Sequence, residues 1–236
     1  MTSIRSNQPI NPITNLRLVI FDCDGTLVDS ETLNNQATLD VLKECGVDGY
    51  TIEHAFHHWM GTTYSSIALR VQMETGKTLP ENFVMRCIAR VAELQSQELK
   101  AVKGASEFID ILNAKKVPSC VASNGERTNV ISSIRLTGLS KYYDEDRIFT
   151  KIQVERPKPA PDIFLFAADK MGVEPGRCVV IEDSEAGVTG AVAAGMTVVG
   201  FTGTSHDKAM QAGRLAKAGA AHITDDFIHI PGLLGL

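Results

Sequence analysis

The sequence predicts an α/β fold, in which a parallel sheet with helices on both faces is interrupted by an all-helical insert. Three features of the chain predict this. An apolar run from Leu18 to Phe21 ends abruptly at acidic residues. This is typical of a buried strand in a parallel sheet whose carboxyl end carries a functional site. Strands and helices alternate from residue 105 onward, which is typical of a parallel sheet. Residues 31–101 contain no convincing strand.

The insert begins directly after the first strand. Ser30 or Asp29 can cap a helix that starts near Glu31. Apolar residues follow at helical spacing until Cys45 and Gly46, which end this helix. Glycines separate three further helical segments, over residues 52–59, 65–74 and 81–100. We therefore predict a helical cap over residues 31–101.

The core is predicted from the two parts of the chain that flank the insert, residues 16–30 and 102–236. Helices are expected over residues 105–113, 127–136, 162–171 and 186–194. Strands are expected over residues 117–122, 148–150, 178–181 and 197–200. Residues 1–15 are polar, contain two prolines and lack an apolar segment, so we expect a flexible leader rather than a signal peptide.

Composition narrows the class of protein. A net charge of -5 over 236 residues, without a basic cluster in the sequence, argues against binding to nucleic acid. No stretch is long enough to span a membrane. Five scattered cysteines without a C-x-x-C pair disfavour zinc sites and disulfides and favour a cytoplasmic protein. Cys23 is expected to be a buried structural thiol, because nothing in the sequence suggests a base for it.

Acidic pairs follow two predicted strands. Asp22 and Asp24 come after the first, and Glu182 and Asp183 come after the strand over residues 178–181. A lone Asp-x-Asp-Gly is common in turns, but four carboxylates at the same sheet edge repel one another unless a cation lies among them. Oxygen-only ligands favour Mg²⁺ over zinc or copper. The sequence therefore predicts a magnesium site here.

Two further strand ends carry groups that suit an anion. Ser123 and Asn124 precede a helix, where they either cap it or bind an anion with the free backbone N–H groups. Lys158 lies between Pro157 and Pro159, which fix the backbone around its ammonium. A solvated loop lysine is the ordinary interpretation, but this rigidity favours a point charge directed at a phosphate.

These motifs together resemble those of the haloacid dehalogenase superfamily, in the branch similar to β-phosphoglucomutase and phosphoglycolate phosphatase. Residues 22–30 resemble the first motif, Ser123-Asn124 the second, Lys158 within residues 158–162 the third, and residues 182–187 the fourth. Their order and spacing agree across the core, and the insert resembles the helical cap of that branch. The resemblance implies a Rossmann-like sheet and an enzyme.

The mechanism implied by the resemblance is phosphoryl transfer through an aspartyl-phosphate. Asp22 would attack phosphorus, while Asp24 would protonate the leaving alcohol and then take a proton from water. Mg²⁺ would be bound by the Asp22 carboxylate, the Asp24 backbone carbonyl and Asp183. Glu182 would either bind the metal directly or support the residues that bind it. The groups expected to hold the phosphoryl oxygens are Ser123, Lys158 and the backbone N–H groups near Gly25, Thr26 and Asn124.

The cap is expected to close over the site and read the rest of the substrate. Gly61 and Thr62, in the loop over residues 60–64, resemble in place the specificity loop of the family. His54, His57 and His58 have a spacing that could bind a metal, but they lack an acidic or cysteine partner in the sequence. We expect them to be solvated or packed within the cap.

The choice of reaction rests on Asp24 and on the cap. Dehalogenases and phosphonate hydrolases of the superfamily lack an acid at the position of Asp24. Phosphosugar mutases resemble one another in an arginine near Tyr64 and a histidine near Asn34, and neither is present. The insert also has six basic residues against nine acidic ones, which suits a second phosphate poorly. We therefore expect a Mg²⁺-dependent phosphatase for a small phosphorylated sugar, sugar acid or polyol.

Two alternatives remain at this point: a phosphosugar mutase and a non-catalytic binding protein with the same fold. The intact acidic, hydroxyl and lysine set speaks against the second. The expected partner is a small phosphorylated metabolite, with no nucleic acid and no membrane, and the chain is expected to be a monomer or a weak homodimer.

Overall fold

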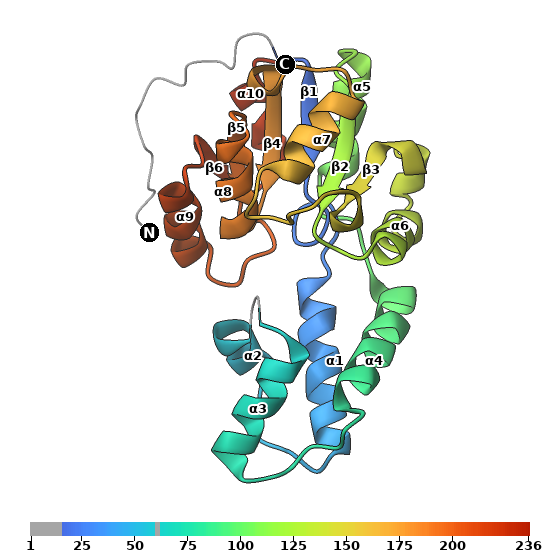
Figure 1. Ribbon diagram of the computed structural model, residues 1–236, viewed down its shortest axis with the longest axis vertical. Helices are drawn as coiled ribbons and strands as arrows, with labels where there is room; N and C mark the ends of the chain where they lie inside the picture. Colours follow the sequence, from blue (N-terminus) through green and yellow to red (C-terminus); the bar gives the residue numbers. More distant parts are fainter. Residues whose placement is uncertain (1–15, 60–61) are drawn as a thin grey trace.

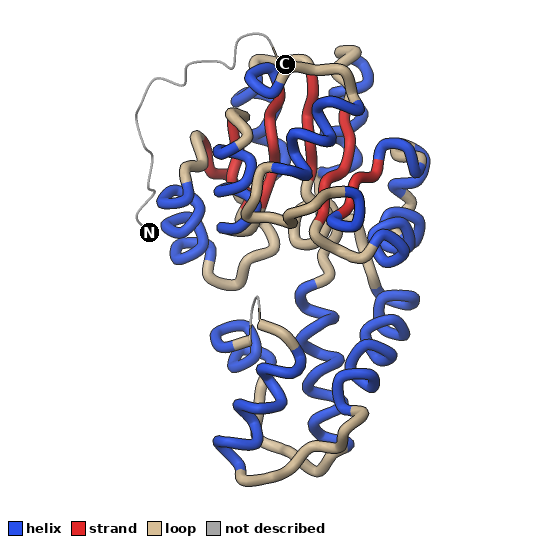
Figure 2. The backbone as a smooth tube through the Cα atoms, viewed as in Figure 1, coloured by secondary structure: helices blue, strands red, loops and turns tan. Residues whose placement is uncertain are grey.

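The structure, a computed structural model, describes residues 16–59 and 62–236. Six parallel strands form one sheet in the order β3-β2-β1-β4-β5-β6 (Figure 2). Their bounds are β1 Leu18–Phe21, β2 Ser119–Ser123, β3 Ile148–Thr150, β4 Cys178–Glu182, β5 Thr197–Phe201 and β6 His222–Thr224. The parallel sheet confirms the predicted α/β fold class, and the first strand lies at its centre.

Both faces of the sheet are buried. Successive side chains of each strand point to opposite faces, and helices cover both. Val19 and Phe21 of β1 belong to one apolar cluster, and Leu18 and Ile20 belong to another. The first cluster includes α5 (Ala105–Ala114), α6 (Arg127–Leu136) and α10 (Ile230–Leu234). The second includes α7 (Asp162–Lys170), α8 (Glu185–Ala193) and α9 (Lys208–Ala218). A strand apolar at every position is thus explained by helices on both faces.

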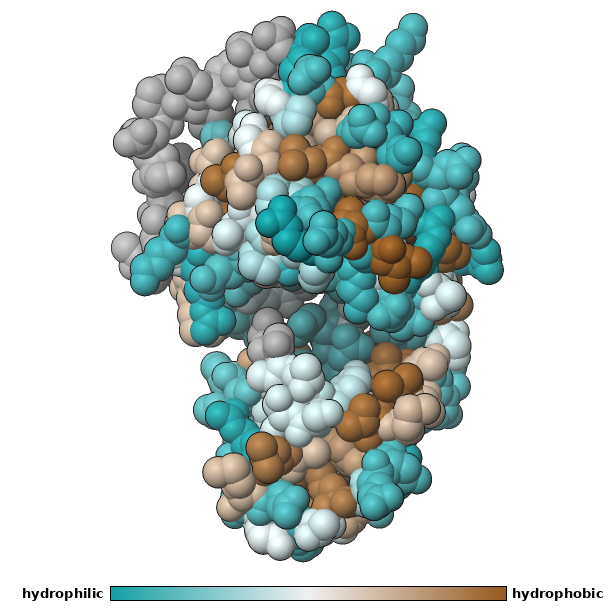
Figure 3. All heavy atoms as spheres, viewed as in Figure 1, coloured by the Kyte–Doolittle hydropathy of each residue, from teal (hydrophilic) through white to brown (hydrophobic). Residues whose placement is uncertain are grey.

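Four helices lie between β1 and α5, and Figure 1 shows them as a separate group beyond one edge of the sheet. They are α1 Glu31–Glu44, α2 Ile52–His58, α3 Tyr64–Thr75 and α4 Phe83–Glu98. These helices enclose their own apolar cluster, which includes Trp59, Val71 and Phe83. Figure 3 shows a hollow between the two lobes on one face, and Leu33, Ala37 and Leu94 of α1 and α4 pack into the first apolar cluster of the sheet. The segments that enter and leave the group are joined, since the Val102 N–H donates to the Leu27 carbonyl at 2.8 Å.

The expected elements recur with small shifts of their ends. The strand expected from residue 117 begins later, at Ser119, because Pro118 has no N–H to give to the sheet. The sequence did not predict α9, β6 or α10. Strand β6 has only three residues and α10 only five, so neither is long enough to show a clear pattern of apolar residues. The structure also has short 3₁₀ helices: η1 Leu139–Lys141, η2 Glu145–Arg147, η3 Lys151–Gln153, η4 Pro175–Arg177 and η5 Phe227–His229.

The remaining general expectations concern the ends of the chain, membranes and cysteines. The leader predicted over residues 1–15 lies outside the described residues. Within the described part, no helix has the length and apolar character needed to cross a bilayer. All five cysteines are free thiols, in line with the absence of a disulfide pattern in the sequence.

Candidate active site

The carboxyl ends of three neighbouring strands bring the predicted site residues together. Asp22 follows β1, Ser123 ends β2 and Glu182 ends β4, and these strands are adjacent in the sheet. They line one cavity of about 190 Å³, whose wall includes most of the predicted site residues: Asp22, Asp24, Ser123, Asn124, Lys158, Glu182 and Asp183. The inference that polar strand ends meet at one edge of the sheet therefore holds for these seven residues.

Lys158 is the cation at the centre of this group. Its Nζ donates to Asp22 Oδ1 at 2.5 Å, to Glu182 Oε1 at 2.7 Å and to the Ala122 carbonyl at 2.8 Å, which uses all three ammonium protons. Its side chain is only 3% exposed. Burial alone would lower the pKa of Lys158, but the Asp22 and Glu182 carboxylates outweigh burial and raise it. The lysine is therefore held charged against both acids.

The acids themselves carry more negative charge than one lysine can balance. Burial raises the pKa of Asp22 to about 8, with Lys158 opposing the shift and Glu182 adding to it. Burial followed by the charges of Glu182 and Asp22 raises the pKa of Asp183 well above its usual range. Glu31, the first residue of α1, also lines the cavity. Five carboxylates thus face one ammonium, a balance that favours a bound cation.

Glu182 is held from both sides. One oxygen accepts the Lys158 bond, and the other accepts from the Ser184 N–H at 2.7 Å and the Ser184 hydroxyl at 2.9 Å. The residue is fully buried. A Cβ on Gly187 would lie 1.6 Å from Glu182 Oε1, so the glycine at that position makes room for the carboxylate. These bonds leave Glu182 supporting Lys158 rather than facing the cavity freely.

Asp183 contacts the loop that follows β1. Its Oδ1 accepts from the Thr26 hydroxyl at 3.2 Å. Gly25 has a φ of +84°, a conformation that favours glycine, and a Cβ there would come within 2.2 Å of Asp183 Oδ2. The Gln211 side-chain amide donates to the Asp183 carbonyl. The carboxylate is therefore placed by a contact from the first loop, and the backbone of Asp183 is held by α9.

Asp24 has a different partner from Asp22. The Ser30 hydroxyl donates to Asp24 Oδ1 at 2.7 Å, and Ser30 is fully buried. Ser30, one of the two residues expected to cap α1, occupies the N-cap position, but its hydroxyl binds Asp24 and makes no side-chain cap bond. Burial raises the pKa of Asp24, and the Ser30 bond opposes that shift. The two acids of the first motif are thus in unlike environments.

Asn124 makes a reciprocal pair with the lysine loop. Its amide nitrogen donates to the Lys158 carbonyl at 3.1 Å, and its amide oxygen accepts from the Lys158 N–H at 3.0 Å. The side chain of Asn124 therefore positions Lys158 and is not directed at a substrate. Ser123 is buried beside it, and its hydroxyl accepts from the Gly125 N–H at 3.0 Å.

Two of the expected phosphate-binding N–H groups are already engaged. The Gly25 N–H donates to the Val28 carbonyl at 2.8 Å and the Thr26 N–H to the Cys23 carbonyl at 3.4 Å. Among the described residues, the Cys23 and Asp24 N–H groups have no backbone acceptor. Within this loop, the N–H groups available to an anion are therefore those of Cys23 and Asp24, directly before the predicted Gly25 and Thr26.

Thr62, the described member of the predicted Gly61 and Thr62 pair, does not line this cavity. Gly61 lies outside the described residues. Thr62 donates its hydroxyl to the Trp59 carbonyl at 2.6 Å and lines a different cavity, of about 240 Å³, whose described walls come from the helical group alone. His54 packs against Tyr50 and Trp59, which agrees with the packed role expected for it.

The donors at the site fit Mg²⁺ better than a metal that needs many protein ligands. Within residues 16–59 and 62–236, no three His, Cys, Asp or Glu side chains gather around one point. Asp22 and Asp183 supply two carboxylates at one cavity, and the Asp24 carbonyl is in the same loop. Mg²⁺ is commonly bound by one or two carboxylates, with waters and substrate phosphate completing the octahedron.

Some residues of the site had no signal in the sequence. Glu31 lines the cavity from the start of α1, although an acid in the first turn of a helix is ordinarily explained by the helix dipole. Gln211 contacts Asp183 from α9, and the Thr204 hydroxyl donates to the Gly25 carbonyl at 2.7 Å. Both contacts join residues far apart in the chain. Cys23 is buried and its pKa is raised by burial and by the neighbouring acids, as expected for a structural thiol.

Comparisons with known proteins agree with this geometry. The sequence profile of the family described as haloacid dehalogenase-like hydrolase matches residues 19–201. The 6-phosphogluconate phosphatase of Escherichia coli (strain K12) is 32% identical over 83% of this chain and 87% of its own length. A phosphorylated carbohydrates phosphatase of Thermotoga maritima is 32% identical over 77% of this chain and 82% of its own. A HAD family hydrolase of Deinococcus radiodurans R1, solved with bound phosphate and sodium, has a TM-score of 0.84 at 30% identity, covering 94% of this chain and 96% of that one.

Proposed function

Because the chain belongs to the haloacid dehalogenase-like hydrolase family and is a phosphatase of that family, we propose that it hydrolyses a small phosphorylated metabolite with the help of Mg²⁺. The predicted resemblance to the haloacid dehalogenase superfamily is confirmed by the family match. The proposed substrate class is a sugar, sugar-acid or polyol phosphate, by similarity to relatives that act on 6-phosphogluconate and on phosphorylated carbohydrates.

The observation that carries the proposal is the bonded triad at the strand ends. Lys158 holds Asp22 at 2.5 Å and Glu182 at 2.7 Å, so the Asp22 carboxylate is fixed in direction at the cavity wall. In the proposed first step, Asp22 attacks phosphorus, the bond from phosphorus to the alcohol oxygen breaks, and an aspartyl-phosphate forms. Water then attacks this phosphorus and releases inorganic phosphate and free Asp22.

Asp24 is the proposed acid and base of the two steps. In the first it gives a proton to the leaving alcohol oxygen, and in the second it takes a proton from the attacking water. Its bond to the Ser30 hydroxyl at 2.7 Å fixes the direction of its carboxyl group, and burial raises its pKa, which favours the protonated form that a general acid needs. Asp22 and Asp24 thus divide the chemistry between them.

The proposed metal ligands are Asp22, Asp183 and the Asp24 carbonyl. A Mg²⁺ ion bound there supplies positive charge to the phosphoryl oxygens. Glu182 is better placed to hold Lys158 than to bind the metal, because its oxygens already accept from Lys158 and Ser184. Ser123 and the Asn124 backbone N–H are proposed to hold the phosphoryl group together with the free N–H groups of the first loop.

The helical group is the proposed cap, over residues 31–101, with residues 1–15 as leader and residues 16–30 and 102–236 as catalytic core. Its own apolar cluster supports a distinct cap domain, which is joined to the core through Leu33, Ala37 and Leu94 of α1 and α4. We propose that this cap closes over the site. Gly61 and Thr62 are proposed to read the part of the substrate beyond the phosphate. Free cysteines support a cytoplasmic location, and we propose a monomer or weak homodimer without nucleic-acid or membrane partners.

Phosphate release from a panel of sugar, sugar-acid and polyol phosphates tests the proposal. We expect release with Mg²⁺, its loss with EDTA, and its loss in Asp22→Asn, while the exposed control Asp146→Asn keeps full activity. No release from any substrate with Mg²⁺, or full activity of Asp22→Asn, would contradict the mechanism. The mutase alternative predicts an isomerised sugar phosphate with little free phosphate, which ³¹P NMR distinguishes.

A further inference from the structure

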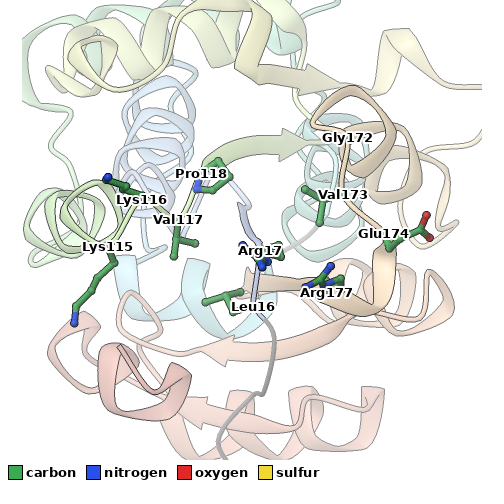
Figure 4. A pocket seen from close by; sticks show the side chains of 10 residues that line it. All are labelled: Leu16, Arg17, Lys115, Lys116, Val117, Pro118, Gly172, Val173, Glu174 and Arg177. Atoms are coloured by element: carbon green, nitrogen blue, oxygen red, sulfur yellow. The ribbon is translucent and has the colours of Figure 1, made fainter.

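A second cavity lies at the opposite end of the sheet from Asp22. It has a volume of about 480 Å³ and is lined by segments that precede β1, β2 and β4 (Figure 4). Arg17 lies directly before β1, and the site acid Asp22 directly after it. Five residues of extended chain span about 16 Å, so this cavity is separate from the catalytic one.

The charge of this cavity is strongly positive. Its wall carries Arg17, Lys115, Lys116 and Arg177 against a single acid, Glu174. Within the described residues, none of these four cations is in an ion pair. In Figure 4 the Glu174 side chain points away from the two arginines. In the same view Arg17 and Arg177 lie beside each other, while Lys115 and Lys116 point outward from the wall. A pair of adjacent arginines without an ion-pair partner, in a chain of net charge -5, requires an explanation beyond solubility.

Backbone contacts fix the chain segments that carry the four basic residues. The Arg17 N–H donates to the Arg177 carbonyl at 2.9 Å, which keeps the two arginines side by side. Lys116 has a φ of +56°, where a non-glycine residue is uncommon. The Val117 N–H donates to the Leu112 carbonyl at 2.9 Å and so fixes the turn that presents both lysines. The dipole of α5 accounts for lysines at its carboxyl end, but not for the arginine pair.

The sequence does not reveal this cluster, because its members come from three segments far apart in the chain. The expectation that the protein lacks a basic cluster therefore holds for the sequence and is wrong for the folded surface. Residues 1–15, which lead into Leu16 at the cavity wall, contain one arginine and no acid. The preceding segment of this chain therefore cannot supply the missing negative charge.

We propose that this cavity is a second anion site, which binds the polyphosphate group of a small molecule. Two adjacent guanidinium groups suit phosphate oxygens, which they contact in pairs, and the lysines at the rim add charge. Leu16, Val117 and Val173 in the wall offer apolar surface to an organic body. A concave site of this size fits a small ligand, whereas a nucleic acid would need a longer basic surface.

Tripolyphosphate is the probe, used with the full chain in EDTA so that Mg²⁺ does not sequester it. Calorimetry gives its dissociation constant for the wild type and for Arg17→Gln/Arg177→Gln, whose side chains are exposed and do not hold the fold. The matched control is Arg135→Gln/Lys217→Gln, which removes the same charge from exposed positions elsewhere. Lysine acetylation read by mass spectrometry locates the bound probe.

We expect the arginine variant to raise the dissociation constant at least about tenfold, and the control to change it less than about twofold. Bound tripolyphosphate should slow acetylation of Lys115 and Lys116 but not of Lys43 on α1. Absence of binding, equal affinity in the arginine variant, or unchanged acetylation of Lys115 and Lys116 would overturn the proposal. Because the assay does not use catalysis, its failure is distinct from failure of the proposed phosphatase activity.

Discussion

Replacement of Lys158 by methionine should destabilise the fold more than any exposed charge replacement. The Lys158 ammonium lies 2.5 Å from Asp22 and 2.7 Å from Glu182, and its side chain is 3% exposed. Removal of one partner from such a buried pair typically costs about 3–5 kcal/mol, because the remaining charges are left without compensation. We therefore expect a loss of about 3–5 kcal/mol in the free energy of unfolding of Lys158→Met.

Urea denaturation at pH 7.5 in EDTA measures this loss, and the chain supplies a matched control. The Lys208–Asp225 pair has an N–O distance of 3.0 Å, but its side chains are 50% and 52% exposed, so Lys208→Met should cost less than about 1 kcal/mol. In Lys158→Met/Glu182→Gln, one uncompensated charge is removed and part of the loss should be recovered. Equal losses in the two single variants would refute the role assigned to Lys158.

Three further predictions address the surroundings of the acids. Ser30→Ala removes the hydrogen bond from the Ser30 hydroxyl to Asp24, and this loss should lower kcat/KM for phosphate release about tenfold or more. Because the same bond lowers the pKa of Asp24, the limb of the pH–rate profile governed by Asp24 should move to higher pH. Gly187→Ala introduces a Cβ 1.6 Å from Glu182 Oε1 and should destabilise the protein by about 1–3 kcal/mol in urea denaturation. Without metal, the free energy of unfolding should fall as the pH rises from about 4 towards 8, because burial raises the pKa of Asp22 from 3.8 to about 8. The increase in Tm on adding Mg²⁺ should therefore be larger at pH 8 than at pH 5.

Each of these has a contrary outcome. An unchanged pH profile in Ser30→Ala would separate Ser30 from the proton transfer. Gly213, in α9, has open space where a Cβ would stand, so Gly213→Ala should stabilise by about 0.5–1 kcal/mol and serves as the control for Gly187→Ala. A Mg²⁺-induced increase in Tm that is equal at both pH values would contradict the excess of negative charge assigned to the site.

The sheet and the acidic strand ends were predictable because their signals are local. An apolar run that ends in Asp22, and another that ends in Glu182, each carry the strand and its terminal polar group in one short segment. Since parallel strands end at the same sheet edge, adjacency follows from the fold class alone. The same reasoning fails for β6, an edge strand of three residues of which two are only partly buried, because so short a segment has too little apolar periodicity to detect.

The partners of the site residues could not be predicted, because they depend on tertiary placement. The backbone N–H of Asn124 stays a proposed phosphate ligand, whereas the binding of its side chain to the Lys158 backbone had no signal in the sequence. Gln211 reaches Asp183 from a helix that sequence analysis missed. Glu31 looks like an ordinary first-turn acid of a helix and yet lines the catalytic cavity. Each role requires knowledge of which segments meet, which single-sequence patterns do not contain.

The central claim is that Asp22 carries the phosphoryl group during turnover. Acid quenching of the enzyme during turnover of its best substrate with Mg²⁺, followed by peptide mass spectrometry, tests it directly. We predict one added phosphoryl group on the peptide that contains Asp22, located at that residue by fragmentation, and none in Asp22→Asn. A phosphoryl group on any other residue, or turnover by Asp22→Asn at the wild-type rate, would contradict the mechanism.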